Sequence, residues 1–360
     1  MKNIKKLLLI VTFIMGITGL YGKDENTQNL VNMAPTYKDV LVATVKNDNG
    51  EDRDLRMNIF IPKTNNKKVP LLVFVHGGGW ARGDYQGDDN PIVNNQNNSA
   101  NQNINQMITD NQSSYKIFKG ILNNGIAFAS IDYRLNSEAK FPAQIFDAKG
   151  AIRFLRAHAD EYGIDSDRIA IAGTSAGAHL ASLLATTNGD KSLEGTVGGN
   201  LNYSSKVMAC VDFYGPTDLL TMGPEMDLSL QTKEQAAETH DSIRANESIL
   251  LGFNKEGQGV GLLRKLKENN ETNSPYWNYV LLATKGSPVY QVTSDDPPFF
   301  IAHGGNDSLV SIQQSLRFKE ALDKMGIENI YMSNSKAPHG NQGDIVNKAA
   351  LNWITNKLNK

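Results

Sequence analysis

The amino-acid sequence predicts an α/β protein with a mostly parallel, eight-stranded sheet flanked by helices. Short apolar runs rich in β-branched residues alternate with longer amphipathic segments along most of the chain. From Leu71 onward strands and helices alternate, which implies a parallel sheet covered by helices on both faces. The first two apolar runs have no helical segment between them, so we expect them to pair as an antiparallel hairpin at one edge.

The predicted elements follow from hydrophobic periodicity and from helix-start signals. The strands are expected at residues 40–45, 55–61, 71–75, 126–131, 169–172, 207–213, 299–302 and 330–332. The helices are expected at residues 113–123, 143–161, 176–186, 311–325 and 342–358. The helix at 143–161 has the strongest pattern, because apolar residues recur at helical spacing after Pro142, a residue suited to a first turn.

Two segments interrupt this alternation. Residues 86–112 are rich in asparagine and contain little to bury, so we expect a mobile surface loop there. Residues 216–298 separate two core strands by far more than a usual connection, with helices expected around 232–251 and 262–269. Because the sheet cannot close without the strand at 299–302, this segment is interpreted as an insertion over the sheet, between strands six and seven.

Composition excludes several classes of protein. The 360 residues include 36 Lys and Arg against 38 Asp and Glu, a net charge of −2, and 40% are hydrophobic, so the chain as a whole is not intrinsically disordered. A pI near 6.3 argues against a nucleic-acid binder, and a mean hydropathy of −0.38 against a polytopic membrane protein. Cys210 is the only cysteine, which leaves no disulfide framework and no zinc-type cysteine cluster.

The N-terminus has the pattern of a secretory signal peptide. Lys2, Lys5 and Lys6 precede a short apolar run, and a polar stretch begins after Gly22. The apolar run is shorter than the roughly 20 residues that span a bilayer, so no stable membrane anchor is expected after cleavage. We therefore expect a signal peptide at 1–22, a mature domain at 23–360, and a secreted or periplasmic location.

The strongest chemical motif is the sequence Gly-Thr-Ser-Ala-Gly at residues 173–177. It follows an apolar strand and opens an alanine-rich helix, the context of a nucleophile elbow. The small residues on either side of Ser175 leave room for a sharp turn that exposes its hydroxyl at the carboxyl ends of the strands. Ser175 is therefore the candidate nucleophile.

A second motif, His-Gly-Gly-Gly-Trp at residues 76–80, directly follows the strand at 71–75. Such a glycine loop can present backbone N–H groups to the carbonyl oxygen that gains negative charge during acyl transfer. We expect the oxyanion hole to comprise the N–H groups of Gly78, Gly79 and Ala176, the last being the residue after the nucleophile.

A serine nucleophile needs a base, and the base needs a carboxylate that orients it. Asp307 and His339 follow two successive strands in the order acid, then histidine, and both come after Ser175. Asp295 and Asp296 are rival acids, but they precede the strand at its opposite end. Asp132 and Arg134 are interpreted as structural charges near the site, each with its own ion-pair partner.

Together these residues resemble the α/β-hydrolase superfamily, over residues 40–358. The resemblance is carried by the motifs at 76–80, 132–135, 173–180, 303–307 and 339–340, supported by 141–144 and 294–299. The chain looks most like the bacterial feruloyl and acetyl-xylan esterase-like branch, close to the hormone-sensitive-lipase-like enzymes. This resemblance implies that Ser175, Asp307 and His339 form a catalytic triad, with the glycine loop and Ala176 as the oxyanion hole.

The resulting hypothesis is a secreted serine carboxylic-ester hydrolase that works through an acyl-enzyme. Its expected partner is an acetyl or feruloyl ester of a carbohydrate or another short-chain ester, with no metal, no cofactor and no nucleic acid. Two alternatives stay open: an amide hydrolase similar to the arylformamidases, and a catalytically inactive carbohydrate-binding or interaction protein on the same fold.

Overall fold

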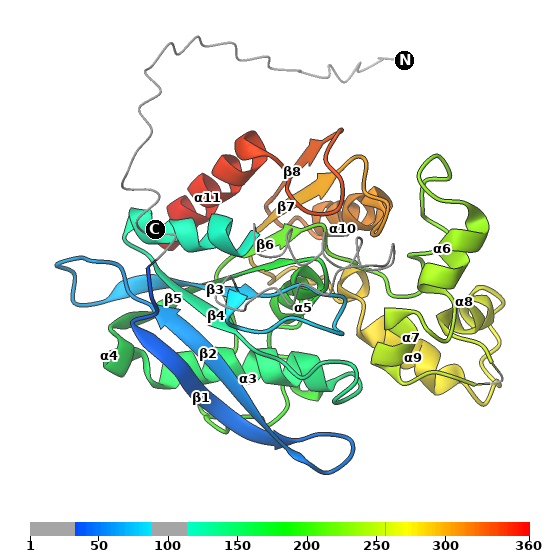
Figure 1. Cartoon of the computed structure of the whole chain (residues 1–360), viewed down its shortest axis with the longest axis horizontal. Helices are drawn as coiled ribbons and strands as arrows, with labels where there is room; N and C mark the ends of the chain where they lie inside the picture. Colours follow the sequence, from blue (N-terminus) through cyan, green and yellow to red (C-terminus); the bar gives the residue numbers. More distant parts are fainter. Residues whose placement is uncertain (1–32, 88–113, 256) are drawn as a thin grey trace, which may run out of the picture.

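The computed structural model describes residues 33–87, 114–255 and 257–360. Within these ranges eight strands form one sheet in the order β1-β2-β4-β3-β5-β6-β7-β8 (Figure 1). The strands are β1 (Tyr37–Lys46), β2 (Asp52–Phe60), β3 (Val69–Val75), β4 (Ala127–Ile131), β5 (Ile164–Thr174), β6 (Cys210–Phe213), β7 (Phe299–Gly304) and β8 (Asn329–Asn334). The predicted eight-stranded sheet is thereby confirmed.

The sheet is antiparallel at one edge and parallel everywhere else. β1 pairs antiparallel with β2, as predicted for the edge hairpin. β2 also pairs antiparallel with β4, and every pairing from β4 through β3 to β8 is parallel. Because β5, β6, β7 and β8 are parallel neighbours, the loops that follow them leave the sheet at the same edge.

Helices cover both faces of the sheet, because successive residues of the buried strands point to opposite sides. Val73 and Val75 of β3 belong to a core shared with helices α3 (Ala143–Ala157), α5 (Ala176–Ala185) and α10 (Ile312–Lys324). Leu72 and Phe74 belong to a second core, shared with helix α11 (Asp344–Leu358) and with the aromatic residues around 115–118. Single short helical turns complete these layers: α4 (Ala159–Tyr162), η2 (Gly120–Asn124) and η3 (Lys191–Leu193).

The segment between β6 and β7 holds a separate group of short helices, at the right of Figure 1. They are α6 (Lys233–His240), α7 (Asn246–Leu251), α8 (Val260–Glu268), α9 (Trp277–Lys285) and the turn η4 (Pro288–Tyr290). We call residues 216–298 the cap. The prediction of one helix at 232–251 is wrong: α6 ends at His240 because Asp241 pairs with Arg264 of α8 and its carbonyl accepts a hydrogen bond from Gly261.

The expected helix at 143–161 is likewise divided into α3 and α4, with His158 between them. The predicted signal peptide at 1–22 and nearly all of the asparagine-rich segment at 86–112 lie outside the described residues. None of the helices in the described ranges is both long enough and apolar enough to cross a membrane.

Candidate active site

The site is built around the turn between β5 and α5. Ser175 has φ +52° and ψ −125°, a strained conformation for a residue with a side chain. Its backbone N–H donates to the Phe213 carbonyl at 2.9 Å, which fixes the turn against β6. Gly177 allows α5 to approach β3 closely, since a Cβ atom there would overlap the carbonyl oxygens of Val75 and His76. The sharp turn lifts the Ser175 hydroxyl above the sheet edge.

The structure brings the three predicted residues together from three separate loops. The Ser175 Oγ lies 2.9 Å from His339 Nε2, and His339 Nδ1 lies 2.8 Å from Asp307 Oδ2. Ser175 follows β5, Asp307 follows β7, and His339 follows β8. With Nδ1 donating its hydrogen to the carboxylate, Nε2 keeps a lone pair for the serine proton.

The surroundings of Asp307 keep its carboxyl group ionised, so that it accepts hydrogen bonds. Its Oδ1 accepts hydrogen bonds from the backbone N–H groups of Leu309 and Val310, at 2.8 and 2.9 Å. Burial alone would raise the pKa of Asp307, but His339 and His303 oppose it and hold the pKa well below its ordinary value. His303 Nε2 lies 3.2 Å from Oδ2, the oxygen that His339 also contacts, and the other ring nitrogen of His303 contacts Ser315.

The rival acids do not reach this cluster. Asp295 and Asp296 precede β7, at the end of the strand opposite to Asp307. Both accept hydrogen bonds from Thr293 in a local turn. Their position follows directly from the direction of the parallel strands.

A cavity of about 130 Å³ opens beside the serine. Its lining residues are Gly79, Trp80, Arg82, Ser175, Ala176, Pro216, Met222, Thr239, His240, Asn246, Glu247, Leu309 and Val310. Of the three predicted oxyanion donors, Gly79 and Ala176 line this cavity with Ser175, whereas Gly78 is not among the lining residues. In the described part of the chain the N–H groups of Gly79 and Ala176 have no hydrogen-bond acceptor, so both are free to bind a substrate oxygen.

The glycine loop is fixed at its end by a buried histidine. Trp80 has φ +57°, and its indole Nε1 donates to His179 Nδ1 at 3.2 Å. The other ring nitrogen of His179 lies 2.6 Å from the Gly286 carbonyl, after α9. Burial lowers the pKa of His179 to about 4, so the ring is neutral and Nε2 carries the donated hydrogen. This Trp80–His179–Gly286 chain joins the glycine loop, the nucleophile helix and the cap.

His76, at the start of the glycine loop, lies beside a buried ion pair. Arg53 pairs with Asp132 at 2.7 Å, and His76 Nε2 lies 3.9 Å from the same carboxylate. Burial raises the pKa of Asp132 to about 7 against the opposing effect of Arg53, and burial lowers the pKa of His76 to about 4.

Arg134 pairs with Asp147 of α3 through its guanidinium nitrogens, at 2.7 and 2.9 Å. The prediction that Asp132 and Arg134 each have an ion-pair partner is confirmed by these contacts. Neither residue lines the cavity beside Ser175.

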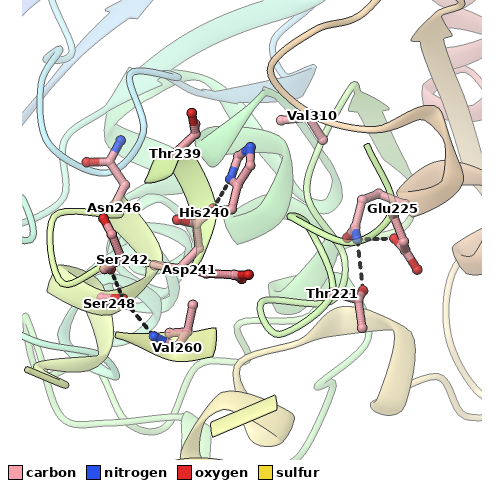
Figure 2. A network of polar contacts seen from close by, with 12 residues as sticks. Thr221, Glu225, Thr239, His240, Asp241, Ser242, Asn246, Ser248, Val260 and Val310 are labelled. Carbon is pink, nitrogen blue, oxygen red and sulfur yellow. Dashed lines mark hydrogen bonds and ion pairs between the residues drawn. The ribbon is translucent and has the colours of Figure 1, made fainter. Parts of the chain in front are cut away.

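Sequence reasoning missed the cavity residues of the cap. Thr239 and His240 end α6, while Asn246 and Glu247 begin α7, and all four line the cavity. Figure 2 shows the side chains of Thr239, His240 and Asn246 extending toward the same side, away from Ser248 and Val260. No local motif marks these residues, because their placement depends on how the cap folds back over the sheet.

An eight-stranded sheet of this order, with a serine on the strand–helix turn and an aspartate and a histidine on later strand-end loops, defines an α/β-hydrolase fold. A family model described as BD-FAE matches residues 102–322, more than half of the chain. The chain belongs to the BD-FAE family.

Known proteins are similar over most of this chain. A probable carboxylic ester hydrolase, LipM of Mycobacterium tuberculosis, is 28% identical over 71% of this chain and 45% of its own length. Esterase LipC of the same organism is 26% identical over 76% of this chain and 53% of its own length. The chain therefore spans about half the length of these curated relatives.

Solved structures show the same fold. A bifunctional GH43-CE protein of Bacteroides eggerthii superimposes with a TM-score of 0.66 and 28% identity, covering 89% of this chain and 38% of that one. A truncated carbohydrate esterase from gut microbiota gives a TM-score of 0.64 at 24% identity, covering 91% of this chain and 100% of that one. The second likeness, at this identity, concerns the fold alone.

Proposed function

We propose that this protein is a serine carboxylic-ester hydrolase whose catalytic triad is Ser175, His339 and Asp307. The observation that carries the proposal is the unbroken chain of contacts from Ser175 Oγ to His339 and on to Asp307, at 2.9 and 2.8 Å. Each distance is within hydrogen-bond reach, as proton transfer between a nucleophile and its base requires.

The reaction follows from this geometry. His339 Nε2 takes the proton of Ser175 while Oγ attacks the ester carbonyl, and the carbonyl oxygen becomes an oxyanion. The free N–H groups of Gly79 and Ala176 stabilise that charge, with Gly78 as the further predicted donor. His339 then gives the proton to the departing alcohol, and water hydrolyses the acyl-enzyme by the same steps in reverse. Asp307 keeps the imidazole in the required tautomer and stabilises its charged form.

The proposed substrates are acetyl esters of carbohydrates, or other esters with short acyl groups, with feruloyl esters as the larger candidates. The cavity beside Ser175, of about 130 Å³, accommodates a short acyl group more readily than an aromatic one. Relatives named as a probable carboxylic ester hydrolase and as an esterase support an ester substrate. A secreted or periplasmic location, proposed from the N-terminal sequence, would place the enzyme beside extracellular polymers.

The decisive variant is Ser175→Ala. We expect it to lower kcat for p-nitrophenyl acetate by about 10⁶-fold, to the detection limit, because the nucleophile is lost. A fluorophosphonate should label the wild-type protein and leave the variant unlabelled. Retained turnover in the variant would contradict the proposal, and a wild-type protein that is neither active nor labelled would favour an inactive binding protein.

The substrate class needs a separate comparison. Initial rates on acetylated xylan, a feruloylated sugar, p-nitrophenyl butyrate and a formyl anilide would rank the competing substrates. We expect acetyl esters to give the highest kcat/KM, and preferred cleavage of the formyl anilide would instead indicate an amide hydrolase.

A further inference from the structure

Asn246 is a polar side chain in the cavity that the proposed reaction does not use. It begins α7 and lines the cavity together with Gly79, Ser175 and Ala176. Its carboxamide lies directly against the glycine loop, since a Cβ atom built on Gly79 would overlap Asn246 Nδ2. Across the described ranges this carboxamide, which is partly buried, has no hydrogen-bond partner. An amide donor without a hydrogen-bond partner therefore lies against Gly79, whose backbone lines the cavity with the serine.

The backbone on which Asn246 stands is tied to the same loop. The Asn246 carbonyl accepts a hydrogen bond from Asn136 Nδ2 at 3.4 Å. The backbone N–H of Asn136 in turn donates to the Trp80 carbonyl at 2.7 Å. Asn136 thus bridges the backbone of Asn246 and the end of the glycine loop.

The next residue, Glu247, connects α7 to the end of α6. Its Oε1 lies 2.9 Å from His240 Nδ1, and both side chains are almost entirely buried. Figure 2 shows Asn246 and His240 rising from neighbouring parts of the cap toward the same side. These contacts fix the backbone from which the Asn246 side chain extends, and a group that stabilises a transition state needs such a fixed starting point.

We propose that Asn246 is a catalytic residue that supplies a third oxyanion donor. Its Nδ2–H donates to the ester carbonyl oxygen when that oxygen becomes negatively charged, beside the N–H groups of Gly79 and Ala176. This inference rests on the proposed ester hydrolysis at Ser175. The cap then takes a direct part in the chemical step, and it also forms one wall of the cavity.

The test uses Asn246→Ala and Asn246→Asp in the full chain. Asn246→Asp keeps the shape of the side chain but replaces the donor with a carboxylate that repels the oxyanion. We expect both variants to lower kcat for p-nitrophenyl acetate by about 100-fold, with KM changed less than about twofold, because the contact strengthens only as charge develops. Should Asn246→Ala fail to fold, the nearly isosteric Asn246→Asp carries the test.

A trifluoromethyl ketone supplies a readout that a merely structural role would not move. It adds to the serine and forms an oxyanion without any alcohol group, so its Ki should rise in proportion to the fall in kcat. The matched control is Asn269→Asp, an exposed asparagine at the end of α8, which should leave both quantities unchanged.

The outcomes separate this inference from the proposed function. If the wild type is active, Ser175→Ala is inactive and Asn246→Asp stays within about twofold of the wild type, the inference is wrong and the proposed function stands. A change confined to KM, or a fall in kcat with an unaltered Ki, would overturn the inference too, because Asn246 would then contact the alcohol portion. A wild type without esterase activity would overturn both.

Discussion

The strands of the sheet and the first helix of the cap differ in how they are held in place. All seven residues of β3 are buried, and its side chains alternate between two apolar cores. In α6, by contrast, only Ala236 and His240 are buried. Ion pairs such as His240–Glu247 and Asp241–Arg264 join the cap helices to one another.

The candidate active site accordingly has two parts, one carried by the sheet and one by the cap. The strand-end loops that hold Ser175, Asp307 and His339 follow the packed strands of the sheet. The opposite wall of the cavity combines apolar packing of the cap helices, through residues such as Leu250 and Leu263, with the buried His240–Glu247 pair. Changes in the sheet should therefore act on the chemical step and on global unfolding. The effects expected in the cap are smaller, and the effect of breaking the His240–Glu247 pair should depend on pH.

The largest expected effect lies at the sheet edge. Asp307→Asn should lower kcat for p-nitrophenyl acetate by about 10⁴-fold, because the amide no longer holds His339 in the productive tautomer. The melting temperature should change far less than the rate. Asp296→Asn, at the opposite end of β7, is the matched control and should retain wild-type kcat; equal losses in the two variants would show that Asp307 is not the orienting acid.

The next largest effect is expected on stability, from a change in the packing of α5 against β3 beside the Ser175 turn. Gly177→Ala places a methyl group against the carbonyl oxygens of Val75 and His76, so β3 and α5 must move apart. We expect the free energy of unfolding, measured in urea, to fall by about 3 kcal/mol.

Gly120→Ala is the control for this variant. A Cβ atom there would meet only the end of the Leu351 side chain, at 3.9 Å, so stability should be nearly unchanged. A Gly177→Ala protein as stable as Gly120→Ala would mean that the helix and the strand are less tightly packed than the structure indicates.

A smaller effect, dependent on pH, is expected in the cap. Burial lowers the pKa of His240, but Glu247 and Asp241 outweigh it and hold the pKa above its ordinary value. The stability from this pair is fully present below the ordinary pKa of about 6.5 and is lost as pH rises through the folded-state value. Glu247→Gln should therefore reduce the free energy of unfolding by about 2 kcal/mol at pH 6 and by much less at pH 9.

Glu238→Gln provides the comparison, on the helix that carries His240. Within the described ranges the Glu238 carboxylate forms a single, exposed pair, with Arg244 at 3.4 Å, so its loss should have no measurable effect at either pH. A loss of stability in Glu247→Gln that is the same at pH 6 and pH 9 would contradict the assignment of His240 as the charged partner.

The smallest effect is expected at Cys210 of β6. The side chain is fully buried and burial raises the pKa of its thiol, so the reactive thiolate is scarce. Iodoacetamide should leave the native protein unmodified and fully active, and should label one site after unfolding in urea. Rapid labelling under native conditions would indicate that the sheet opens far more readily than its packing suggests.

The sheet could be predicted from the sequence more fully than the cap. The central strands β3, β4, β6 and β7 were found from short apolar runs, since buried parallel strands need apolar side chains on both faces. Ser175, Asp307 and His339 could be selected because residues that follow parallel strands gather at one edge of the sheet. Their convergence depends on strand direction, which the alternating order already specifies.

The cap could not be predicted in the same way. The pattern across 232–251 is consistent with one helix. The chain nevertheless turns after His240, where Asp241 forms an ion pair with Arg264, a residue that is distant in sequence. His240 and Asn246 thereby reach the cavity through tertiary contacts that no local spacing encodes. The exclusion of Gly78 from the cavity lining likewise depends on the positive φ angles of the glycine loop, which sequence alone leaves undetermined.

The buried Trp80–His179–Gly286 chain has a consequence for how the enzyme tolerates acid. Both ring nitrogens of His179 are occupied, one receiving the indole hydrogen and the other donating to the carbonyl. A second proton on the ring would set two hydrogens against each other, and the pKa of about 4 reflects how strongly burial resists it. We therefore expect the attachment of the glycine loop to the nucleophile helix and the cap to be insensitive to pH down to about 5.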